Sequence, residues 1–140
     1  MKIKVQRFED VDQAREYAKL AIDEAAEAAR ARYITSGSGQ AMEYQEAYRQ
    51  AQEFLANPAA SAPMVMADVL SETINPSTDL PVASVGEAAS LIVFMYEQWT
   101  GVGTEIRRLR LAGKASVKTA ATAAEVAHIR ETTIAGLNAL

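Results

Sequence analysis

Carboxylates are the side chains of this 140-residue chain whose spacing comes nearest to a reactive site. Asp23 and Glu27 stand four residues apart, so they would share one face of a helix. Glu43 and Glu46 stand three residues apart and would do the same. A dinuclear metal site in a helical bundle needs a Glu-x-x-His motif from two helices, whereas the single histidine is His128. We therefore interpret these carboxylates as solvated helix faces and predict no metal site.

Other catalytic patterns are absent from the sequence. Cysteine does not occur, which excludes thiolate chemistry and disulfides. The segment Thr35–Gly39 lacks the lysine of a phosphate-binding loop, and no Gly-x-Ser-x-Gly turn is present. We expect His128 at the surface or partly buried. We therefore predict a protein that is not an enzyme, with no catalytic residue, cofactor or small-molecule substrate. Composition and spacing alone do not identify its function.

The composition favours closely packed helices. Hydrophobic residues make up 49% of the chain, but 28 of its residues are alanines and only 6% are aromatic. Alanine is the strongest helix former and lets helices approach closely. The net charge of -4 argues against nucleic-acid binding. The longest apolar run, Leu91–Tyr96, is six residues, whereas a membrane span needs about 20, so we predict no membrane association.

Residues 1–8 alternate polar and apolar side chains, which predicts a short strand. No other segment of the sequence is predicted to form a strand that could pair with it, so this strand would be free to pair with another chain. An extended arm that lies on the helices is the alternative. The segment contains no continuous apolar stretch typical of an export signal, and we expect a cytoplasmic protein. The predicted partner-binding residues of this arm are Ile3, Val5 and Phe8.

The next residues, 11–55, predict a helical hairpin. Asp10 and Gln13 form a capping box that begins a helix over residues 11–33, which has an alanine-rich inner stripe. A turn over residues 35–39 leads to a second helix, which Asn57-Pro58 ends. Residues 57–81 contain all four prolines and predict an irregular excursion with a short helix over residues 64–74.

The longest predicted helix spans residues 85–112, after a capping box at Ser84 and Glu87. Its apolar residues recur at alternating steps of three and four, which is the spacing of a seam that faces another helix. Gly113 is expected to end or bend it. Thr122 and Glu125 form a further capping box, which begins a final helix that runs nearly to residue 140. Trp99 in this seam is predicted to bind a partner, in addition to Ile3, Val5 and Phe8 of the arm. The seam contains Val85, Ala88, Ile92, Met95, Trp99, Val102, Ile106 and Leu109.

These elements predict an all-α protein: one domain over residues 1–140, with a bundle of four to five helices, a long central helix and a short N-terminal extended arm or strand. Residues 85–140 supply the long helix and the C-terminal helix. A group of cations near the end of the long helix would complement the helix dipole. Its members are Arg107, Arg108, Arg110, Lys114 and Lys118.

Several short motifs of the sequence resemble those of small alanine-rich helical proteins of tailed bacteriophages, of the kind encoded near tail and tail-fibre genes. The first half of the resemblance lies in Ala29–Thr35 and Gly39–Ala47. The second half lies in Trp99, Arg108–Ala115 and Thr122–Val126. The resemblance carries no catalytic residues.

The resemblance implies a virion protein of the tail, baseplate or tail fibres that acts through protein contacts. Its implied partners are other phage tail or fibre proteins, and a homo-oligomer such as a trimer or ring would suit a repetitive organelle. The chain would be made in the host cytoplasm and then reside in the virion. Two alternatives stay open: an assembly chaperone that is absent from the mature particle, and a small host-interaction protein.

Overall fold

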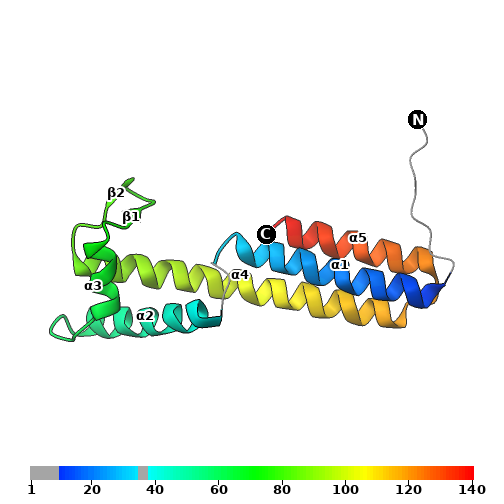
Figure 1. The fold of residues 1–140 in the computed structure, drawn as a ribbon, viewed down its shortest axis with the longest axis horizontal. Helices are drawn as coiled ribbons and strands as arrows, with labels where there is room; N and C mark the ends of the chain where they lie inside the picture. Colours follow the sequence, from blue (N-terminus) through cyan, green and yellow to red (C-terminus); the bar gives the residue numbers. More distant parts are fainter. Residues whose placement is uncertain (1–9, 35–37) are drawn as a thin grey trace. The chain divides into compact units, whose positions relative to one another are not determined.

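The computed structural model describes residues 10–34 and 38–140, and these form five helices and one two-stranded hairpin (Figure 1). The contacts divide the chain into two compact units. The terminal unit combines Met1–Ile34 with Val102–Leu140, and the central unit is Thr35–Gly101. The long helix α4, Val85–Thr119, contributes to both. The described residues confirm the predicted all-α class with a long helix.

The terminal unit contains α1 (Val11–Ala31), the second half of α4 and α5 (Ala123–Asn138). Small side chains dominate its interior, as the alanine stripe predicts. Ile22, Ile106 and Leu137 are the largest of the fully buried residues there. Four alanines of α1 are also buried, namely Ala14, Ala18, Ala26 and Ala29.

Gly113 lies inside α4, so the helix does not end there, as one of the two predicted outcomes had it. A Cβ atom at this position would lie 2.6 Å from the Thr133 Cγ2 atom of α5. Both residues are buried. The missing side chain therefore provides room for α5, and the helix continues for another turn and a half to Thr119.

Side chains of α1 and of the two residues that follow it bind backbone carbonyls near the C-terminal ends of α4 and α5. The Arg15 guanidinium donates to the Ala120 carbonyl oxygen at 2.7 Å. The Arg32 guanidinium donates to the Leu137 carbonyl oxygen at 2.9 Å, and the Tyr33 hydroxyl donates to the Leu140 carbonyl oxygen. The last carbonyls of a helix have no partner within it, so these bonds tie the α1 segment to the C-terminal ends of α4 and α5.

The predicted capping boxes are present at α4 and α5. The Glu87 backbone N–H donates to the Ser84 hydroxyl, and the Glu125 backbone N–H donates to the Thr122 hydroxyl. Both glutamates accept a backbone N–H in return, from Ala83 and from Ala121. At α1 only the Asp10 side of the predicted box forms, with Asp12 as donor. Each cap contributes about 1 kcal/mol to helix stability.

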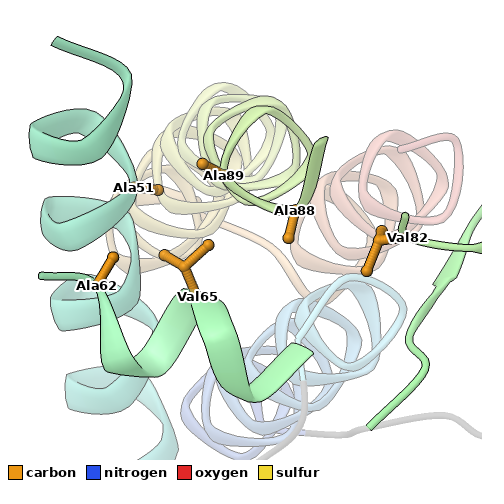
Figure 2. Packing of buried hydrophobic residues seen from close by; sticks show 6 residues of the cluster. All are labelled: Ala51, Ala62, Val65, Val82, Ala88 and Ala89. Atoms are coloured by element: carbon orange, nitrogen blue, oxygen red, sulfur yellow. The ribbon is translucent and has the colours of Figure 1, made fainter. Parts of the chain in front are cut away.

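The central unit contains α2 (Ser38–Ala56), α3 (Pro63–Leu70), the strands β1 (Ile74–Asn75) and β2 (Leu80–Pro81), and the first half of α4. Figure 2 shows Val65 of α3 pointing toward Ala88 and Ala89 of α4. Half-buried hydrophobic residues such as Phe54 and Ile92 surround this cluster. The full buried cluster is Ala51, Ala62, Val65, Val82, Ala88 and Ala89.

A buried amide joins α2 to the start of α3. Ala62, the N-cap residue of α3, has no side chain that could accept a hydrogen bond. The Gln50 side-chain oxygen instead accepts the Met64 backbone N–H at 2.9 Å. The Gln50 amide nitrogen donates to Glu46 at 3.1 Å, so both ends of this buried side chain are satisfied.

The central unit differs from prediction in three places. Helix α2 begins at Ser38, within the predicted turn, and α3 ends at Leu70 rather than near residue 74. Strands β1 and β2 were not predicted. They pair Ile74 with Pro81 and Asn75 with Leu80 around a four-residue loop. The predicted hairpin of the first two helices and the single domain stay predictions, because α1 and α2 fall in different units.

We expect Glu72→Gly to stabilise the central unit. Glu72 follows α3 with a φ of 53°, where its N–H donates to the Val69 carbonyl and the Thr73 N–H donates to the Asp68 carbonyl. These two bonds form a Schellman motif, in which glycine avoids a left-handed penalty of about 1 kcal/mol. Chemical denaturation followed by Trp99 fluorescence should show a gain of about 0.5–1 kcal/mol. Glu72→Ala removes the same charge and should show no gain.

Candidate interaction surface

The carboxylate pairs of the sequence make ion pairs rather than a shared site. Asp23 accepts hydrogen bonds from Lys114 at 2.9 Å and Arg110 at 3.2 Å, whereas Glu27 pairs with Arg30 at 2.9 Å. The described parts of the chain hold no group of three or more His, Asp or Glu residues that could bind a metal ion together. These carboxylates therefore stabilise helices and helix contacts.

The second pair contains Glu46, whose partner is Arg49. The Arg49 hydrogen bond, assisted by one from Gln50, lowers the pKa of Glu46 to about 2. Arg49 also donates to Glu53 at 2.8 Å on the same helix. This cation is thus engaged by two carboxylates of α2.

The basic group near the end of α4 is divided among several partners. Arg110 and Lys114 bind Asp23, and Arg108 binds Glu105. Arg107 and Lys118 are exposed. Most of the group therefore serves contacts within the terminal unit.

His128 is exposed on α5, in agreement with the prediction. It borders a shallow hollow at the reversal between α4 and α5. Glu125, which also borders the hollow, is the reciprocal partner of the α5 cap. The remaining residues of the hollow are Ser116, Thr119, Ala120, Ala124 and Ile129.

The ion pairs of Asp23 predict a pH dependence. Hydrogen bonding from Lys114, assisted by Arg110, holds the pKa of Asp23 below its ordinary 3.8. A lowered folded-state pKa adds stability above the unfolded-state value, and this is lost as pH falls through the folded-state pKa. Asp23→Asn should therefore cost about 0.5–1 kcal/mol at neutral pH, a range limited by its partial exposure. Denaturation curves of variant and parent should approach each other as the pH falls below 3.8 and converge once it is below the folded-state pKa of Asp23. Equal curves at neutral pH would contradict the role of this pair, and the exposed Glu24→Gln is the control.

The most distinctive feature of the described surface is a set of exposed large apolar residues, most of which lie in the central unit. The terminal unit exposes only three of the twelve, namely Tyr17, Leu20 and Leu111. Contiguous exposed apolar surface marks sites of protein contact. The nine of the central unit are Met42, Tyr44, Leu55, Met66, Leu70, Ile74, Leu80, Phe94 and Met95.

Four of these nine residues gather along residues 66–81, which we call the hairpin tip. Figure 1 shows the β1–β2 hairpin following directly on the end of α3. Within the tip, Leu70 is 78% exposed and Leu80 is 63% exposed. Ile74 is 50% exposed and Met66 is 41% exposed. Side chains of this kind gain about 25 cal/mol for each Å² that a partner covers.

Charge divides between the units as strongly as apolar exposure does. The central unit holds eight carboxylates and a single cation, Arg49, so its formal charge is -7. The terminal unit is left with +3 of the chain's total of -4. The hairpin tip contributes three carboxylates and no cation. These are Asp68, Glu72 and Asp79.

Of the four partner-binding residues predicted from sequence, the structure describes only Trp99. Ile3, Val5 and Phe8 lie outside the described residues. Trp99 is half-buried on α4. Sequence reasoning missed the hairpin tip, for which the Asn75–Asp79 turn residues between Ile74 and Leu80 were the available signal.

The heptad seam of α4 faces different surroundings along its length. Ala88 and Ile106 are buried, whereas Met95 is 46% exposed. Phe94, one residue off the seam, is 61% exposed. Tyr96 stacks on Tyr48 of α2 with ring centroids 4.1 Å apart. The seam thus serves the two cores near its ends and leaves apolar groups in the middle exposed.

The fold and its surface define the class of this protein: an all-α chain of two compact units, with an acidic central unit that exposes large apolar residues. No family model, curated protein or solved structure matches the chain. Among the described helices, none combines the length and apolarity that crossing a bilayer requires.

Proposed function

We propose that this protein is a structural component of a bacteriophage particle, located in the tail, baseplate or tail fibres, and that it acts without catalysis through protein contacts. The observation that carries the contact role is the hairpin tip, where apolar and acidic side chains are exposed together. The phage assignment depends on the resemblance to alanine-rich tail-region proteins of Ala29–Thr35, Gly39–Ala47, Trp99, Arg108–Ala115 and Thr122–Val126.

The central unit buries small side chains and exposes large apolar ones, which favours a role in protein contact. Its buried cluster consists of alanines and two valines, whereas leucines, methionines, a phenylalanine and an isoleucine are exposed. Full burial of a large apolar side chain stabilises by about 1.5–3 kcal/mol. The exposed side chains of the central unit would gain free energy of this kind when a partner covers them. The proposed partners are other tail or fibre proteins and further copies of this chain in a trimer or ring.

Quantitative mass spectrometry of purified particles tests this function. We expect the chain to be present at a fixed copy number that survives washing at high salt. Absence from the particle, together with binding to unassembled fibre protein, would instead support the assembly chaperone. Absence from the particle and recovery with a host protein would support the host-interaction protein.

A further inference from the structure

We propose that the hairpin tip of one copy binds the N-terminal segment, residues 1–8, of a second copy. This inference rests on the proposed function, because it names a partner for the surface that carries it. Beyond the proposed function, it names the segment that binds the hairpin tip and the kind of contact that the two surfaces make.

Charge complementarity is the first argument for this occupant. The segment contains Lys2, Lys4 and Arg7 and no carboxylate. The hairpin tip contains three carboxylates and no cation. The one cation elsewhere in the central unit, Arg49, is engaged by Glu46 and Glu53. The acidic tip therefore lacks an internal counter-charge, and complementary charge would favour this partner over acidic ones.

The apolar residues of the two surfaces also match. Ile3 and Val5 would share one face of an extended chain, and Lys2 and Lys4 would share the other. The tip offers exposed apolar and acidic side chains along the same short stretch of chain. If residues 1–8 pair with the tip as an additional strand, the side chains on both faces of that strand can contact the tip. The apolar residues would then contact its apolar side chains, and the basic residues would contact its carboxylates.

The backbone of β1 supplies the third argument. The Val82 N–H donates to the Thr73 carbonyl at 2.8 Å, and the next pair along the ladder is Ile74 with Pro81. Positions alternate along an antiparallel ladder, so Ile74 turns its N–H and C=O to the outer edge. An extended peptide can pair with such an edge. The edge is short, which limits pairing to a few bonds and leaves the side chains to supply specificity.

Each copy would carry one donor segment and one acceptor tip. Such a contact is heterologous, because the two surfaces in it are different. Successive copies then form a ring when the rotation closes. The inference is therefore consistent with the proposed homo-oligomer.

Disulfide trapping between two different variants tests the contact directly, since the chain has no cysteine of its own. Val5→Cys protein is mixed with Ile74→Cys protein under mild oxidation. A disulfide requires Cα atoms within about 7 Å, so we expect a heterodimer that accumulates at least about tenfold faster than with the control. The control partner is Ala135→Cys, an exposed position on α5.

Equal trapping with Ile74→Cys and Ala135→Cys, or none with either, would overturn the inference. A chain that carries both Val5→Cys and Ile74→Cys provides a further check. Exclusive formation of its internal disulfide, independent of concentration, would place the contact within one copy and would also overturn the inference. These experiments use the purified chain, so a failure here leaves the measurement on particles to decide the proposed function by itself.

Charge exchange gives a second, independent readout. Lys2→Glu/Lys4→Glu and Glu72→Lys/Asp79→Lys should each lose self-association, because donor and tip then carry like charges. An equimolar mixture should associate again, since every contact between the two variants is complementary. Sedimentation velocity measures this, and circular dichroism verifies that each variant retains its helices. Variants that stay folded and associate as strongly as the parent would contradict the contact.

Discussion

Replacing Gly113 with alanine will lower the free energy of unfolding of the terminal unit by about 2 kcal/mol. The new methyl group would overlap the buried Thr133 side chain, at 2.6 Å from Cγ2 and 2.7 Å from Oγ1. Contacts this short force α4 and α5 apart, and the favourable helix propensity of alanine is too small to compensate. Hydrogen exchange in peptides from α5 should therefore become faster.

Gly101 supplies a matched control on the same helix. A Cβ atom there would have nothing within 4 Å, so Gly101→Ala should increase stability by about 0.5–1 kcal/mol. Adding Thr133→Ala to Gly113→Ala should recover part of the loss, because it removes the two nearest atoms. Equal effects of the two glycine substitutions would refute the account of Gly113 as a point of close approach.

Val65→Asp is expected to unfold the central unit. Val65 is fully buried against alanines of α2 and α4, and no cation in that cluster could pair with a carboxylate. An unpaired buried charge costs about 3–5 kcal/mol or protonates instead, which is a large share of the stability of a small unit. Trp99 is the only tryptophan of the chain and lies in this unit, so its fluorescence reports the transition.

The control for this substitution lies two residues away on the same helix. Ala67 is exposed, so Ala67→Asp should change stability by no more than about 0.5 kcal/mol. A folded Val65→Asp variant whose fluorescence equals that of the parent would show that the cluster does not hold the central unit together.

The helices could be predicted from sequence because their signals are local. Apolar spacing along α1 and the hydroxyl caps at Ser84 and Thr122 act within one or two turns, and the structure has them as expected. Gly113 shows the limit of this reasoning. A glycine ends a helix or makes room for a neighbour, and the difference depends on Thr133, a residue of another helix.

The interaction surface was harder to predict for the same reason. The exposure of Leu70 and Leu80 depends on what packs over α3 and the hairpin, which periodicity does not record. The heptad seam similarly predicts one continuous buried stripe, yet Met95 within it is 46% exposed. The charged residues can be counted from the sequence, but the difference in charge between the two units can be calculated only when the structure gives the bounds of each unit.

The most direct test of the central claim, that the chain works through contacts at the hairpin tip, is its copy number in particles assembled with surface variants. Leu70→Ser/Leu80→Ser alters the tip, and Leu20→Ser/Leu111→Ser alters leucines exposed on the terminal unit. Quantitative mass spectrometry should find the terminal-unit variant at the copy number of the parent and the tip variant reduced at least about tenfold, which corresponds to about 1.4 kcal/mol of lost contact. Equal incorporation of both variants would contradict the claim.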